Sequence, residues 1–320
     1  MLGRILLILI LLLICGCGAK QFDLPSQSKS FSQNVTYNNK VDIILMVDNS
    51  SSMVQYQDKF AEQVPNMVTS LNKLSMDYHI AIVSSDMRDG MGSGGKFIGN
   101  PSFLTSKTSN LTTLLAQRVK LGQLGSDLER GIDSVKAVLD ADYLSSEGRG
   151  FLRPEAYLAT IYLTNEDDWG LTKVDDMIAF MDVVKPKLAD GRRGWISNFI
   201  GVTSVNGNCA TNPDLKEPGL KYMQLSDASG GLKESICLSG LGKAVENVKI
   251  RIVQILSDFK LGRKPIETSL KVFVNGKEVP NGNVNGWQYI PEGYIIRFYG
   301  EAIPGAFDTI SVDFKPADAT

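Results

Sequence analysis

The sequence predicts an α/β protein, with a doubly wound, mostly parallel sheet over residues 41–262 and a small all-β domain over residues 263–320. Three observations support this. Short apolar runs alternate with stretches in which apolar residues recur every three or four positions, the pattern of strands separated by helices. The apolar runs show no polar alternation, as in strands buried on both faces of a parallel sheet. From residue 266 the chain changes to short alternating segments broken by Gly and Pro, which is typical of antiparallel strands.

A polar turn directly follows the first apolar run, residues 41–47. Asp, Asn and Ser favour turns because their side chains bond the nearby backbone. We expect this turn at the surface, at the carboxyl end of a central strand, where open α/β sheets place ligands. Asp48, Ser50 and Ser52 alternate, so one carboxylate and two hydroxyls can converge on one point. These are the hard oxygens that Mg²⁺, Mn²⁺ or Ca²⁺ prefers. The alternative is a Ser-rich turn that caps the next helix.

This turn resembles the metal-ion-dependent adhesion site of the von Willebrand factor A domain family. The family motif Asp-x-Ser-x-Ser is matched by Asp48, Ser50 and Ser52, after a hydrophobic strand as in the family. The resemblance covers residues 41–262. It implies a central, mostly parallel sheet between helices, a metal ion at the carboxyl edge of the sheet, and two further loops that complete the metal site.

The second metal loop of the family precedes a helix and supplies a Thr. In this chain residues 121–127 form a Gly-broken loop before a helix expected over residues 128–139, and Ser126 stands at the place of the Thr. The resemblance therefore implies that the Ser126 hydroxyl is a metal ligand. The alternative is that Ser126 or Asp127 only caps the helix, and the two roles are compatible.

The third metal loop of the family follows a buried strand, expected here over residues 156–163, and carries an Asp directly after a Thr or Ser. This sequence departs from the family because Asn165 stands at that place. The Asn carbonyl can accept a hydrogen bond from a metal-bound water or coordinate weakly, and Asp167 or Asp168 can supply the missing charge. The alternatives are an acidic loop that is only solvated, or one that fills the site and leaves no room for a ligand.

The remaining elements follow from the same patterns. Helices are expected over 53–74, with a kink or interruption at Pro65, and over 111–119, 174–184, 222–228 and 241–259; strands are expected over 78–84, 195–202, 270–274, 287–290, 294–299 and 309–314. Residues 90–96 fit the phosphate-loop pattern G-x-x-x-x-G-K, but Phe97 replaces the Ser or Thr that holds Mg²⁺. Pro101 then prevents the helix that a phosphate cradle needs, so we expect no nucleotide.

The first 40 residues precede the expected fold. Residues 5–14 are an Ile/Leu run behind Arg4, a signal-peptide core that is too short to span a bilayer. Residues 14–17 (ICGC) resemble a bacterial lipobox, which implies removal of residues 1–16 and a lipid on Cys17. The residue after Cys17 is Gly18 and not Asp, which resembles the sorting signal of outer-membrane lipoproteins in bacteria with two membranes. Residues 17–40 are polar and read as a flexible tether. The alternative is a plain secretory signal with incidental cysteines.

The two cysteines outside the leader, Cys209 and Cys237, are expected to form a disulfide, because an exported protein folds in an oxidising compartment. Two buried thiols are the alternative.

Charge and residue content exclude several functions. The net charge of −2 gives no basis for electrostatic nucleic-acid binding. The only histidine, His79, lies inside an expected strand, and the chain has no G-x-S-x-G elbow, so we expect no enzyme.

The expected function is metal-dependent binding of a protein partner by a lipid-anchored protein of the bacterial cell envelope. The hydroxyls and the Asn are neutral, so Asp48 is the one anionic ligand among the residues that match the family's metal loops. Mg²⁺ takes six oxygens, and an Asp or Glu of a partner can complete the set and neutralise the charge. This matches the binding mode of the family. The alternative is a structural envelope lipoprotein whose metal site is degenerate.

Overall fold

The structure is a computed structural model that describes residues 31–36, 39–89, 92–188, 191–206, 209–215, 217–238, 240–305 and 308–317. Its main part is a six-stranded sheet of order β4-β3-β2-β5-β6-β7. Neighbouring strands are parallel except at β4, which pairs antiparallel with β3. The strands are β2 (Lys40–Val47), β3 (Asp77–Ser84), β4 (Leu104–Thr105), β5 (Tyr157–Leu163), β6 (Trp195–Gly201) and β7 (Lys233–Ser235).

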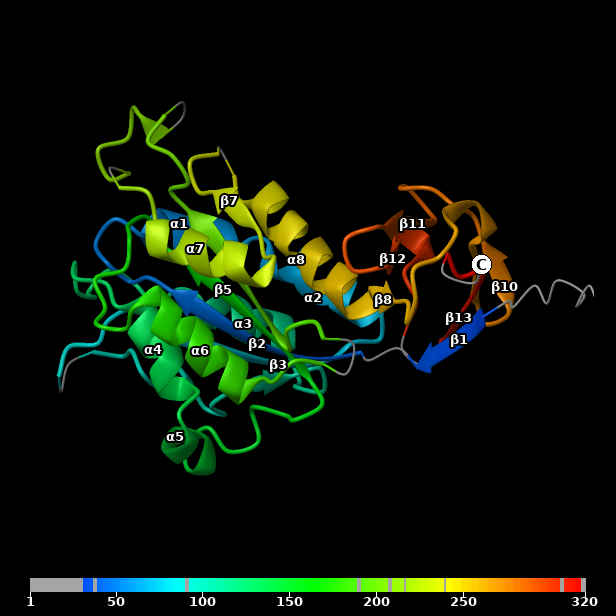
Figure 1. The fold of residues 1–320 in the computed structure, drawn as a ribbon. Helices are drawn as coiled ribbons and strands as arrows, with labels where there is room; N and C mark the ends of the chain where they lie inside the picture. Colours follow the sequence, from blue (N-terminus) through cyan, green and yellow to red (C-terminus); the bar gives the residue numbers. More distant parts are fainter. Residues whose placement is uncertain are drawn as a thin grey trace, which may run out of the picture.

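Helices cover both faces of this sheet, because alternate residues of each central strand are apolar on opposite faces. Ile43 and Leu45 of β2 pack into one core with the first helix layer, whereas Ile44 and Met46 pack into the other. The first layer contains α1 (Val54–Ala61), α2 (Val64–Lys73), α3 (Leu111–Arg118) and α8 (Gly242–Ser257). The second contains α4 (Gly131–Val138), α6 (Val174–Val184) and α7 (Leu220–Ser229), with the short α5 (Ala141–Ser145) beside it (Figure 1).

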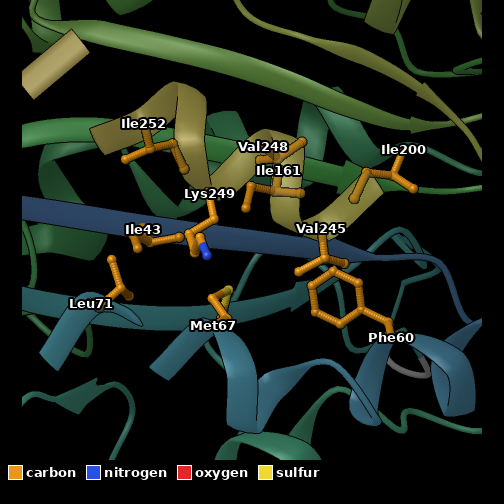
Figure 2. Close-up of a pocket in the computed structure, with 10 residues that line it drawn as sticks. All are labelled: Ile43, Phe60, Met67, Leu71, Ile161, Ile200, Val245, Val248, Lys249 and Ile252. Carbon is orange, nitrogen blue, oxygen red and sulfur yellow. The ribbon is translucent and has the colours of Figure 1, made fainter. Parts of the chain in front are cut away.

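Figure 2 shows how the first layer meets the sheet around a small hydrophobic pocket. Ile43, Ile161 and Ile200 come from three adjacent strands and face side chains of α1, α2 and α8, including Phe60. Lys249 lines the same pocket with its aliphatic stem, while its Nζ donates to Ser70 Oγ at 2.9 Å. The apolar contacts hold the central strands rigidly, and this fixes the loops at their carboxyl ends.

A separate antiparallel β region follows α8 and has its own core of buried side chains around Val272, Trp287 and Ile296. One sheet has the order β1-β13-β9-β10 and the other has the order β11-β12-β8. The elements are β1 (Phe31–Thr36), β8 (Phe259–Lys260), β9 (Lys271–Val274), β10 (Lys277–Val279), β11 (Trp287–Ile290), β12 (Ile295–Phe298) and β13 (Thr309–Phe314), with 3₁₀ turns η2 (Glu267–Ser269) and η3 (Gly300–Ala302).

The coarse prediction of an α/β fold with a mostly parallel sheet and a C-terminal β region is confirmed. The expected hairpin at Asn275-Gly276 is also present: both residues have positive φ and join β9 to β10. The GK-containing loop is followed by bends and turns up to Pro101, without a helix, although residues 90 and 91 lie outside the described residues.

The expected interruption of the helix over residues 53–74 is present: α1 ends at Ala61, the chain turns at Glu62 and Gln63, and Pro65 lies in the first turn of α2. Two other boundaries differ from expectation. Helix α4 begins at Gly131 rather than at residue 128. Residues 31–36, expected in the flexible tether, form β1 and pair with β13. The leader, Cys17 and the rest of the tether up to residue 30 lie outside the described residues.

Candidate metal centre at the carboxyl edge of the sheet

Asp48 is at the centre of a polar cluster where β2, β3 and β5 end. Its backbone N–H donates to Leu163 O at 3.0 Å, which continues the β2–β5 pairing by one residue. Its carboxylate is fully buried and accepts hydrogen bonds from Ser50 N at 2.8 Å and from the hydroxyls of Ser50, Ser85 and Thr164 at 3.1–3.2 Å. The strand ends thus place four oxygen-bearing side chains together, as expected of parallel strands.

Glu129 is the second carboxyl of this cluster, and no sequence motif pointed to it. Its Oε2 lies 2.5 Å from Thr164 Oγ1, and the side chain is fully buried. Two backbone bonds hold its segment in place: Trp169 N donates to Glu129 O at 2.7 Å, and Arg130 N donates to Ser85 O at 2.9 Å. Burial and the adjacent Asp48 raise the pKa of Glu129 well above its usual range. Burial also raises the pKa of Asp48, so the two carboxyls hold a proton between them at neutral pH.

Among the buried side-chain oxygens that have no hydrogen-bond partner in the described part of the chain, two belong to the segment before α4 and the loop after β5. These are Glu129 Oε1 and Asn165 Oδ1. The amide nitrogen of Asn165 is used, because it donates to Asp214 O at 2.6 Å. A buried oxygen without a partner is costly, and a hard cation satisfies such an atom. The available donors, carboxylates, hydroxyls and an amide carbonyl, therefore fit Mg²⁺, Mn²⁺ or Ca²⁺ by chemical type.

Three of the residues that the sequence suggested as ligands make no contact with this cluster among the described hydrogen bonds. Ser52 is half-exposed, and its hydroxyl makes no hydrogen bond within the described residues. The hydroxyl of Ser126 accepts from Leu128 N at 3.0 Å, so it closes a local turn rather than capping α4. Asp167 Oδ1 accepts from Lys221 N at 2.9 Å, at the start of α7. The structure brings together Asp48 and Ser50 of the expected set. Asn165 directly follows Thr164 in the chain, and its amide donates to Asp214 O in the loop after β6.

Thr164, Ser85 and Glu129 are the members of the cluster that sequence reasoning missed. Thr164 and Ser85 each directly follow a strand of the sheet, and this position was the available signal. Glu129 has no such signal, because it lies within residues 128–139, which were expected to form a helix.

A second set of contacts fixes the loops around the cluster. Gln57 of α1 donates to Asp48 O at 2.8 Å and to Gly122 O at 2.9 Å, and it accepts from Gly122 N at 3.0 Å. Gly125 N donates to Asn49 O at 2.8 Å, and a Cβ at Gly125 would stand only 2.3 Å from Asn49 Oδ1. These contacts join the loop after β2 to the loop before α4, so the two loops move as one unit.

The expected disulfide is present between Cys209 and Cys237, which are 28 residues apart. It closes the loop after β6 against the segment before α8. This loop supplies Asp214 O to Asn165, and Asn212 Nδ2 donates to Tyr56 OH at 3.1 Å. The disulfide therefore stabilises the loop that positions the Asn165 side chain.

Within the described residues, no three His, Cys, Asp or Glu side chains are grouped as metal ligands. The candidate centre has two carboxyls, with hydroxyls and an amide carbonyl as its other oxygens. Among the described helices, none has the length and apolar character needed to cross a membrane.

A scan against protein-family models finds no match for this sequence, and a search of curated proteins finds none. Among solved structures, the pilus adhesin SpaC from Lactobacillus rhamnosus GG matches with a TM-score of 0.43 and 14% identity, over 89% of this chain and 40% of that chain. Proximal thread matrix protein 1 from the mussel byssus matches with a TM-score of 0.42 and 11% identity, over 71% of this chain and 51% of that chain. The chain thus spans about half or less of the length of these two proteins.

Proposed function

We propose that this protein binds a protein partner through a divalent cation, Mg²⁺ or alternatively Mn²⁺ or Ca²⁺, held at the carboxyl edge of the sheet. The observation that carries the proposal is the buried, unpartnered oxygen Glu129 Oε1 in the carboxyl and hydroxyl cluster of Asp48 and Thr164. Asn165 Oδ1, on the residue after Thr164, is a second buried oxygen without a partner among the described residues. We propose Asp48, Ser50, Thr164 and Glu129 as the residues that hold the cation, with Asn165 as a further oxygen donor.

The protein side of this centre is preorganised for ligand binding. Ser50 and Thr164 point their hydroxyls at the Asp48 carboxylate, and Gln57 and the Gly125–Asn49 contact hold the surrounding loops. The cation would supply a positive charge that attracts an Asp or Glu carboxylate of the partner. The chain's own residues supply orientation and water exclusion, which suits binding rather than catalysis. The protein is therefore proposed to act as a binding protein and not as an enzyme.

We further propose that the protein is anchored to the bacterial cell envelope, in the outer membrane, through a lipid on Cys17. The support for this is the leader sequence and the ICGC motif at residues 14–17. The disulfide between Cys209 and Cys237 agrees with export to an oxidising compartment.

The test of the metal centre is Asp48→Asn, because Asn keeps the shape of the side chain and can still accept hydrogen bonds. Isothermal titration of the full chain with Mg²⁺, Mn²⁺ and Ca²⁺ is expected to show saturable binding that Asp48→Asn weakens at least about tenfold. Asp127→Asn, on the exposed part of the neighbouring loop, is the matched control and is expected to bind metal normally. Capture of partners from envelope extracts is expected only without chelator. Equal metal binding by the two variants would contradict the proposal.

One observation favours a structural role instead. Thr164 Oγ1 is 2.5 Å from Glu129 Oε2 and 3.2 Å from Asp48 Oδ2, so this hydroxyl links the two carboxyls directly. In this alternative, the proton shared by Glu129 and Asp48 compensates the Asp48 charge in place of a cation, and the metal site is degenerate. Absence of binding at millimolar Mg²⁺, Mn²⁺ and Ca²⁺ would support this alternative.

A further inference from the structure

The sequence Asn-Gly recurs in the C-terminal β region. Three such pairs begin at Asn275, Asn281 and Asn285, and all three Asn residues are exposed. A fourth pair begins at Asn206, but its Gly207 lies outside the described residues. Asn is a chemically labile residue, and a following Gly has no Cβ to hinder attack of its backbone nitrogen on the Asn side chain. The three pairs are therefore candidates for spontaneous modification.

The reaction is a loss of ammonia followed by hydrolysis. The Gly backbone nitrogen loses its proton to solvent base and bonds to the Asn Cγ. The bond from Cγ to Nδ2 breaks, and Nδ2 takes up a proton and leaves as ammonia. Water then opens the succinimide ring at either carbonyl, which gives Asp or an isoaspartyl residue whose backbone runs through Cβ. No oxidant or reductant is needed, so the hydrogen bonds of the two reacting groups determine which pair reacts in the folded chain.

The side chain of Asn275 is held at both of its polar atoms. Its Nδ2 donates to Asp308 Oδ1 at 2.7 Å, and its Oδ1 accepts from Thr309 N at 2.9 Å and from Thr309 Oγ1 at 3.3 Å. Attack by Gly276 N requires the amide to leave these partners. The amide side of this pair is therefore protected.

At Asn281 the attacking nitrogen is engaged instead. Gly282 N donates to Trp287 O at 2.9 Å, and Trp287 N donates to Pro280 O at 3.1 Å. A backbone N–H bonded to a carbonyl has to give up that bond before it can lose its proton. This pair is therefore protected at its nucleophile.

Asn285 has neither protection. Among the described residues, Gly286 N donates no hydrogen bond and Asn285 Nδ2 has no acceptor. Gly286 is buried, and a buried backbone N–H without a partner is rare and costly. Asn285 Oδ1 accepts from Glu301 N at 3.0 Å. Attack on Cγ places negative charge on this oxygen, and a backbone donor already in place stabilises that charge.

We infer that Asn285 is a site of spontaneous deamidation and isoaspartate formation, and that the fold protects Asn275 and Asn281. The inference is independent of the metal centre.

Modification at Asn285 would affect the strand that follows. The product has a carboxylate at residue 285, and Glu301, the donor to this side chain, carries a second one. The isoaspartyl form also lengthens the backbone directly before Gly286, whose carbonyl accepts from Tyr299 N at 2.8 Å. Modified chains are therefore expected to unfold at a lower temperature than fresh ones.

The experiment incubates the full chain at mildly alkaline pH, folded or in urea, and follows each pair by peptide mass spectrometry. Isoaspartyl methyltransferase detects the isoaspartyl product. In the folded chain, Asn285 is expected to convert at least about tenfold faster than Asn275 and Asn281, because one hydrogen bond lost from the reactant corresponds to about that factor in rate. In urea the three rates are expected to become similar. Equal rates in the folded chain, or slower conversion at Asn285, would overturn the inference.

Two variants test the cause of the difference. Asp308→Ala removes the acceptor of the Asn275 amide and is expected to speed conversion at Asn275 several-fold without changing Asn285. An unchanged rate at Asn275 would show that hydrogen bonding does not protect it. Asn285→Gln is the control, because Gln would have to form a six-membered ring. It is expected to keep its unfolding temperature on incubation while the wild type loses part of its own, and an equal loss in both would show that Asn285 is not the site.

Discussion

The chemistry of the candidate centre depends on one buried pair, Asp48 and Glu129. Burial and mutual repulsion raise the pKa of Glu129, so it remains protonated in the folded chain at a pH where it has ionised in the unfolded chain. The folded state then binds more protons than the unfolded state. The free energy of unfolding therefore falls as the pH rises above the ordinary Glu value of about 4.5.

Glu129→Gln is expected to remove this dependence, because Gln is neutral at every pH. Without metal, the variant should be at least as stable as the wild type at pH 8, and its free energy of unfolding should vary less between pH 5 and pH 8; one group contributes at most about 1.4 kcal/mol per pH unit. Urea unfolding at several pH values measures this. Glu147→Gln, at an exposed position, is the control. Identical pH dependence in Glu129→Gln and wild type would show that the pair does not hold the extra proton.

The sequence predicted the position of Asp48 and Ser50 but not their surroundings. The turn was expected at the surface, whereas Asp48 is fully buried and Ser50 nearly so. A motif records which residues follow a strand, but burial depends on the loops from other strands that cover it. Glu129 was missed for the same reason, since only the fold brings the segment before α4 to the end of β5.

The elements around the centre are coupled through loops rather than through regular secondary structure. Gln57 on α1 links the loop after β2 to Gly122 with three hydrogen bonds. Because Asp48 O and both polar groups of Gly122 depend on this one side chain, it couples the first two loops of the site.

Gln57→Leu is expected to destabilise the protein by about 1–3 kcal/mol, because it leaves buried polar groups without partners. It should also weaken Mg²⁺ binding, since the two loops are no longer held together. Urea unfolding and isothermal titration measure these two effects. Gln117→Leu at an exposed position of α3 is the control and is expected to be near neutral. Loss of stability with unchanged metal binding would show that loop coupling does not serve the site.

The loop after β6 depends on its disulfide in the same way. Replacing both Cys209 and Cys237 by Ser is expected to lower the free energy of unfolding by roughly 3–4 kcal/mol in the chain-entropy model, for a separation of 28 residues. Thermal unfolding measures the loss. Wild-type protein with the disulfide reduced should match the double variant, and reduced protein as stable as the oxidised form would refute the role of the bond.

At the element level, the sequence predicted the long central strands closely because each is a continuous apolar run buried on both faces. It did not predict β4 (Leu104–Thr105) or β7 (Lys233–Ser235), which are very short. It also did not predict β1, whose sequence FSQNVT is mostly polar. Strand β1 forms because β13, near the other end of the chain, offers a free edge, and no local pattern encodes that pairing.

At the scale of the whole molecule, the two ends of the described chain meet in the small β region. Strand β1 pairs with β13, and both lie at the opposite end of the molecule from the loops of the candidate centre (Figure 1). An anchor at Cys17 would therefore hold the β region near the membrane and leave the candidate centre facing away from it.

Cys17→Ser is expected to release the protein from the membrane fraction, because the proposed lipid acceptor is lost. Cys15→Ser, two residues earlier, is the matched control and should remain attached. Fractionation of cells with detection of the protein in each fraction measures this. Membrane retention of a processed Cys17→Ser form would refute the proposed anchor.

The order of β1 and β2 along the chain determines how a pulling force would act on the protein. Strand β1 (residues 31–36) lies in the β region, and β2 (residues 40–47) lies inside the main sheet and leads to Asp48. Tension between an anchored N-terminus and a captured partner would travel along this one backbone segment. Because β2 is bonded to β3 and β5 along its length, the load would be resisted in shear by two ladders at once, without passing through the helices or the disulfide.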